Sequence, residues 1–162
     1  MDNDNKALFG VFDGHGGREV AVYCGDHYGD ILKDKQSVIA ETDIREWLRR
    51  SFLDVDTAIR TEEGQKEIGD LRKAKPPKKS PILQILAGDK NNGEDKQEDM
   101  MLDSIGCTSN VIYVDYEQGN GKIYVANAGD SRCTLGKSKQ MVEMSIDHKP
   151  EGPVEIERIE KA

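Results

Sequence analysis

The hydrophobic pattern of the chain changes abruptly near its start, and this change limits the folds that the chain can adopt. Residues 7–12 (ALFGVF) form a short apolar run that is typical of a buried strand. A glycine-rich turn, DGHGG at 13–17, follows at once. From Arg18 onwards, residues recur every three or four positions as on one face of an amphipathic helix: Val20, Tyr23, Cys24, His27, Tyr28, Ile31 and Leu32. The pattern predicts a strand, a tight turn and a helix in succession.

A second helix and a charged segment follow. Residues 44–59 carry a clear apolar stripe, and Thr42 is the candidate N-cap of this helix. Residues 64–104 are rich in charge, and their apolar stretch is confined to 82–87. Such a composition buries too little apolar area to offset the entropy lost on ordering. We interpret 64–104 as a charged, mobile insertion within one domain, because the strands after it need partners.

The last third of the chain alternates with a period of two residues. Thr108, Asn110 and Ile112 are expected on one face of a strand, and Val111 and Tyr113 on the other. Turn signals at 119–121, 129–131 and 136–139 divide residues 107–145 into four strands of an antiparallel meander. A final helix is predicted from Pro153. The predicted fold class is α+β, with antiparallel β-sheets flanked by helices.

Composition excludes several classes of function. The formal charge of −8 argues against a nucleic-acid binder or an anionic-membrane binder, which would need a basic face. No apolar run approaches the ~20 residues of a membrane span, and the acidic N-terminus is unlike a secretion signal. The three cysteines lack metal-ligand spacing and are expected to be small buried hydrophobic residues of a reducing compartment. We therefore expect an intracellular protein, cytoplasmic or nuclear.

The DGHGG segment contains the strongest candidates for chemistry. A carboxylate at Asp13, where a strand ends, suits a hard cation such as Mg²⁺ or Mn²⁺. Gly14 would let a backbone carbonyl approach the same ion, and His15 can exchange a proton near neutral pH. A dinucleotide fingerprint fails because Glu19 stands where its last glycine belongs, and a P-loop fails because no Lys-Ser/Thr pair follows. An aspartyl-phosphate enzyme would usually carry a second acid at the position of His15.

Less specific interpretations of the same residues remain open. Asp13 is also compatible with a tight turn that caps a helix. Asp130 lies in a turn between two strands, where Asp is most often only a turn former. Asp147 is compatible with a simple turn at a strand end, and His27 with a satisfied core histidine.

Four segments, in this order, resemble the metal-dependent protein serine/threonine phosphatases of type 2C: VFDGHGG, GCTSNV, VANAGDSR and DHKPEGPVEIERI. The resemblance covers residues 7–162 except 64–104. It implies a pair of packed antiparallel sheets flanked by helices, and hydrolysis of phosphoserine and phosphothreonine in phosphoprotein substrates by a metal-activated water. It also implies that Asp13 bridges two Mg²⁺ or Mn²⁺ ions, that the Gly14 carbonyl binds one of them and that His15 is the general acid. Asp130 matches the acid of a third, weaker metal position.

The resemblance is incomplete at both ends of the chain. Only six residues precede the first strand, and the later aspartate blocks of the family have no counterpart before Ala162. We therefore expect residues 1–162 to form a partial catalytic domain with an incomplete two-metal centre and little or no activity alone. A non-catalytic pseudophosphatase or regulatory binding module is the alternative. Exposed sheet edges also predict self-association.

Residues 72–86 are a candidate docking segment for a kinase or another partner. Lys78 and Lys79 precede the alternating apolar residues of 82–86, and Ser80-Pro81 is a plausible proline-directed phosphorylation site. The alternative is a solvated loop whose apolar patch packs locally.

Overall fold

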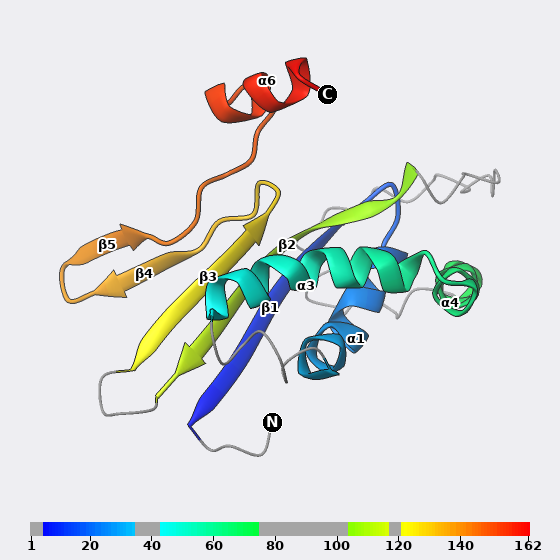
Figure 1. Cartoon of the computed structure of the whole chain (residues 1–162), viewed down its shortest axis with the longest axis horizontal. Helices are drawn as coiled ribbons and strands as arrows, with labels where there is room; N and C mark the ends of the chain where they lie inside the picture. The colour runs from blue at the N-terminus through cyan, green and yellow to red at the C-terminus, as the bar shows by residue number, and fades with distance from the viewer. Residues whose placement is uncertain (1–4, 35–42, 75–103, 117–120) are drawn as a thin grey trace, which may run out of the picture.

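The computed structural model describes residues 5–34, 43–74, 104–116 and 121–162. Its elements in chain order are β1 (Lys6–His15), α1 (Glu19–Asp34), α3 (Ile44–Ile59), α4 (Glu62–Lys73), β2 (Gly106–Asp115), β3 (Lys122–Ala128), β4 (Thr134–Lys137), β5 (Gln140–Glu143) and α6 (Pro153–Glu160). Helices α1 and α3 cross one face of the sheet that contains β1, β2 and β3 (Figure 1). The predicted α+β class, with helices against antiparallel strands, is confirmed.

The strands form two sheets. The first is antiparallel, with β2 between β1 and β3, and β1 pairs with β2 from Lys6 opposite Asp115 to His15 opposite Gly106. Strands β4 and β5 form a separate two-stranded sheet, so the prediction of one four-stranded meander was wrong. The chain leaves the first sheet after β3 because Ser131 bonds to side chains of β2 instead of continuing the ladder.

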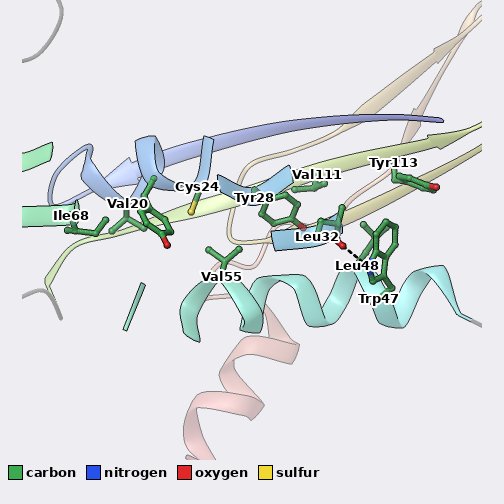
Figure 2. Close-up of a cluster of buried hydrophobic side chains, with 11 residues drawn as sticks. Val20, Cys24, Tyr28, Leu32, Trp47, Leu48, Val55, Ile68, Val111 and Tyr113 are labelled. Atoms are coloured by element: carbon green, nitrogen blue, oxygen red, sulfur yellow. Dashed lines mark hydrogen bonds between the residues drawn. The ribbon is translucent and has the colours of Figure 1, made fainter. Parts of the chain in front are cut away.

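The hydrophobic core lies between the helices and the sheet. Trp47 and Leu48 of α3 and Leu32 of α1 are buried against Val111 and Tyr113 of β2. Figure 2 shows these side chains in the space between α3 and the sheet. The Trp47 ring meets Tyr113 edge-on with centroids 5.4 Å apart, and its indole N–H donates to the Leu32 carbonyl over 3.3 Å. The apolar stripes predicted for both helices are therefore the core faces.

Helix α3 begins one residue later than predicted. Asp43, and not Thr42, is the N-cap: its carboxylate accepts hydrogen bonds from the backbone N–H groups of Arg45 at 2.9 Å and Glu46 at 3.3 Å. An Asp at this position satisfies donors that have no partner within the helix.

Helix α4 occupies the start of the segment that was expected to be irregular. Ile68 is completely buried in the core, and the Thr61 hydroxyl caps the helix by accepting from the Gly64 N–H at 3.1 Å. Acidic residues lie in its first turn and basic residues in its last, as the helix dipole favours. Residues 64–73 are therefore helical and packed on the core, and not irregular as expected, whereas the interpretation of 64–104 as an insertion stays a prediction. Residues 75–103 lie outside the described residues, and with them most of the candidate docking segment 72–86.

Polar contacts join α4 to α1. The Arg18 guanidinium donates to the carbonyls of Ala74 at 3.1 Å and Leu71 at 3.5 Å, next to the end of α4. His27 is paired with Glu67 over 2.7 Å, which confirms that it is a satisfied histidine, although it is only half-buried. These contacts hold the α4 segment against the helix that follows the DGHGG motif.

The face of the sheet opposite the helices carries exposed apolar side chains. Phe9 and Val11 of β1 are 60% and 64% exposed, and Ile123 of β3 is 41% exposed. Self-association through the edges of this sheet remains a prediction. No helix within the described ranges is long and apolar enough to cross a membrane.

Candidate active site

The sequence predicted a turn over the whole DGHGG segment, residues 13–17. In the structure only Gly16 and Gly17 form the turn. Strand β1 continues to His15, and the ladder places Asp13 opposite Thr108 and Gly14 opposite Cys107. Asp13 and His15 are exposed, whereas Phe12 points to the helices and contacts Tyr28 with ring centroids 5.5 Å apart. Because side chains alternate along a strand, Asp13 and His15 lie on the face away from the helices.

The turn itself is made by Gly16 and Gly17. Gly16 has φ of +71°, and a Cβ on it would lie 2.3 Å from the Ser104 carbonyl oxygen. Only glycine adopts this backbone conformation so close to the backbone of Ser104 without strain. The tight turn lets α1 begin at Glu19 and fixes the end of β1 that carries Asp13.

His15 lies over the start of β2. A Cβ built on Gly106, its cross-strand partner, would lie 2.9 Å from the Cε1 and Nε2 atoms of the His15 ring. The glycine therefore leaves the room that the imidazole occupies. This places a group that can donate a proton on the same sheet face as the Asp13 carboxylate, two residues further along the strand.

A network of hydrogen bonds brings the loop after β3 to the same end of the sheet. The hydroxyl groups of Thr108 and Ser131 are 2.7 Å apart. The Asn110 amide donates to the Asn127 side chain at 2.8 Å and to the Ser131 carbonyl at 3.3 Å. Asn110 is buried, so these bonds satisfy an amide that would otherwise be costly to bury. Thr108 and Asn110 were predicted to share a face, but this network was not predicted.

Asp130 is positioned by that loop. It is exposed and lies between Ser131, which bonds to Thr108, and Gly129, which has φ of +114°. Since Thr108 lies opposite Asp13, both candidate acids are found at one end of the sheet. They do not form a complete metal site: over the described residues, no group of three or more His, Cys, Asp or Glu side chains could hold a metal ion.

An ion pair fixes the other side of the loop. The Arg132 guanidinium donates two hydrogen bonds to the Asp147 carboxylate, at 3.0 and 2.9 Å, and Lys149 lies 3.7 Å from it. The hydrogen bonds from Arg132 and its positive charge hold the pKa of Asp147 below its ordinary value. The His148 N–H also donates to the Gly129 carbonyl over 2.9 Å. Asp147 is thus more than a turn former; the only sequence signal was opposite charge on the two segments that flank β4 and β5.

Two cysteines meet beside the site. The Sγ atoms of Cys24 in α1 and Cys107 in β2 are 3.6 Å apart, and both line a cavity of about 380 Å³. The hydrogen bond between the thiols, together with burial, raises the pKa of Cys24, and the same hydrogen bond lowers the pKa of Cys107. Cys24 is buried as predicted, but Cys107 and Cys133 are partly exposed, so simple core packing does not describe all three.

The donor atoms at this end of the sheet suit a hard cation in kind but not in number. The Asp13 carboxylate and the Gly14 carbonyl are oxygen donors, which Mg²⁺ and Mn²⁺ prefer. A magnesium ion takes six ligands, whereas the described residues supply no cluster of three acidic, histidine or cysteine side chains. Over the described residues, the Asp13 carboxylate and the Gly14 carbonyl are thus oxygen donors at this end of the sheet without a complete set of metal ligands.

Comparison with known proteins identifies the family to which the chain belongs. Residues 1–162 match the family model for protein phosphatase 2C. "Probable protein phosphatase 2C 2" of Paramecium tetraurelia is 38% identical over 157 residues, which are 96% of this chain and 42% of that protein. "Probable protein phosphatase 2C 11" of Oryza sativa subsp. japonica is 34% identical over 174 residues, covering 100% of this chain and 46% of that protein. The chain belongs to the protein phosphatase 2C family, and it spans less than half the length of these relatives.

Proposed function

We propose that the protein is a metal-dependent phosphatase of phosphoserine and phosphothreonine in proteins, and that Asp13, Gly14 and His15 form one corner of its catalytic centre. Family membership supports the reaction class. The observation that carries the assignment of residues is the ladder between β1 and β2. It holds Asp13 and His15 on the exposed face of the sheet, away from the core.

Each residue has a role that follows from its position. The Asp13 carboxylate and the Gly14 carbonyl would hold Mg²⁺ or Mn²⁺, and Asp130, on its anchored loop, would contribute to a further cation position. A bound divalent cation supplies activation of water as a nucleophile and neutralises charge on the phosphoryl oxygens. The His15 imidazole, over Gly106, would donate a proton to the seryl or threonyl oxygen as it leaves.

The charge at the site determines what this chain is expected to do alone. Two divalent cations bring four positive charges, and a single carboxylate cannot balance them. Because the described residues contain no cluster of three such ligands, we infer that further anionic groups complete the centre. The 162-residue chain by itself is then expected to turn over a phosphopeptide slowly or not at all.

Manganese binding and turnover test this proposal together. Titration of Mn²⁺ into the chain, followed by electron paramagnetic resonance of the free ion, is expected to show weak binding that Asp13→Asn reduces at least tenfold. Asp26→Asn is the matched control, because Asp26 is an exposed acid on α1. Hydrolysis of a phosphothreonine peptide is measured on the same samples. Mn²⁺ binding that is equal in the wild type and Asp13→Asn, or rapid turnover that survives Asp13→Asn, would refute the assignment.

A further inference from the structure

We propose that Cys24 and Cys107 form a redox-active thiol pair, which a hydroperoxide oxidises to a disulfide that joins α1 to β2. The two sulfur atoms are 3.6 Å apart and belong to residues 83 positions apart in the chain. A disulfide requires a separation of about 2.05 Å. The thiols are therefore already within van der Waals contact, and the bond requires the two sulfur atoms to approach by about 1.5 Å.

The cavity provides the route for the oxidant. It measures about 380 Å³, and both thiols line it together with apolar walls from Val20, Val55 and Ile105. A cavity needs only about 10–15 Å³ to hold one water molecule, so hydrogen peroxide can enter. Cys24 is only 3% exposed, so the thiol pair is reached through the cavity and not from the outer surface beside Cys24.

The order of attack follows from exposure. Cys107 is partly exposed and its sulfur lies 3.8 Å from the Ser109 hydroxyl, whereas Cys24 is buried. The Cys107 sulfur attacks the hydroperoxide: an S–O bond forms, the O–O bond breaks, and the displaced oxygen leaves as an alcohol, or as water from hydrogen peroxide. The Cys24 sulfur then attacks the Cys107 sulfur, so that the S–S bond forms and water leaves. Two thiols are oxidised and one hydroperoxide is reduced, which balances the two electrons transferred.

The location of the bond gives it a structural consequence. Cys107 lies opposite Gly14 in the ladder, at the end of the sheet that carries the candidate metal ligands. A disulfide would tie α1 to the strand that positions Gly14. Closing so long a loop restricts the unfolded chain, so the oxidised protein is expected to melt at a higher temperature than the reduced one.

The test uses the full chain and its third cysteine as an internal control. The reduced protein is treated with hydrogen peroxide, unfolded in the presence of N-ethylmaleimide and analysed by intact and peptide mass spectrometry. The proposal expects a loss of two hydrogen atoms, a cross-linked Cys24–Cys107 peptide that dithiothreitol cleaves, and alkylation at Cys133 alone. Three alkylated cysteines, a sulfinic acid at Cys107 with Cys24 still alkylated, or a disulfide that includes Cys133 would overturn it.

Two variants check the roles of the thiols. Cys24→Ser removes the thiol that closes the bond, so dimedone is expected to trap a sulfenic acid at Cys107. Cys133→Ser is the matched control and is expected to form the cross-link as the wild type does. Failure of dimedone to label Cys107 in folded Cys24→Ser, or loss of the cross-link in folded Cys133→Ser, would contradict the scheme. The wild-type peptide map decides the proposal if either variant does not fold.

Discussion

Replacing Ile68 with alanine is expected to lower the free energy of unfolding by about 3 kcal/mol. Ile68 lies in α4, within the segment whose composition predicted an irregular insertion, yet its side chain is 0% exposed. The substitution therefore tests whether the charged sequence of α4 is part of the folded core.

The magnitude follows from burial. The change removes three carbon atoms, and at ~0.8 kcal/mol for each buried CH₂ the transfer term is about 2.4 kcal/mol. The cavity that remains adds to this and places the loss within the range of about 2–5 kcal/mol that buried Ile to Ala changes give. Helix propensity opposes the loss, because alanine favours a helix more than isoleucine by a few tenths of a kcal/mol. For a chain of this size, Tm is expected to fall by about 6–12 °C.

The assay is urea denaturation followed by tryptophan fluorescence. Trp47 is the sole tryptophan and is 2% exposed against Tyr113, so its emission reports directly on the core. Lys66→Ala, on an exposed position of the same helix, is the control and is expected to change stability by less than about 0.5 kcal/mol. A change below about 0.5 kcal/mol for Ile68→Ala would show that α4 is not part of the cooperative fold.

Two further predictions concern the loop that carries Asp130. Gly129→Ala is expected to lower the free energy of unfolding by about 1–3 kcal/mol, because φ is +114° and a Cβ would lie 2.6 Å from Thr108; an unchanged urea midpoint would contradict this. Arg132→Gln is expected to raise the pKa of Asp147 towards its ordinary value, as followed by the carboxyl chemical shift. In the wild type the Arg132–Asp147 pair stabilises the fold above the ordinary pKa of Asp and is lost as pH falls through the lowered pKa. Lys139→Gln is the control, and an Asp147 titration that is the same in both variants would disprove the explanation.

Periodicity predicted the elements whose burial is one-sided. The strand at 107–116 was assigned because polar and apolar residues alternate, and the structure places Val111 and Tyr113 in the core as that alternation required. The helix around Trp47 was predicted for the same reason, with an error of one residue at its cap. Helix α4 was missed because its apolar content is low. A buried isoleucine, Ile68, and contacts from Arg18, which precedes α1, and from His27 of α1 outweigh that composition.

The candidate site was predicted in its residues but not in its arrangement. Asp13 and His15 were identified from local sequence, and the sheet places both on one exposed face. Cys24 and Cys107 are 83 positions apart, so spacing held no signal for their contact. Arg132 and Asp147 are 15 positions apart, and only their opposite charge pointed to the pair. Strands β4 and β5 form a local hairpin, and the sequence pattern did not show that this hairpin is a sheet separate from β3.

The length of β1 is under tighter constraint than its composition. Ten consecutive residues of this strand are matched with β2, and neighbouring side chains point in opposite directions. Inserting or deleting one residue between Leu8 and Asp13 would move every later residue of β1 to the opposite face of the sheet. The Asp13 carboxylate would then lie in the hydrophobic core between the sheet and the helices. A substitution of an exposed side chain such as Phe9 leaves this register unchanged, whereas a change in the number of residues does not. The number of residues in β1 therefore determines the face of the sheet on which Asp13 lies.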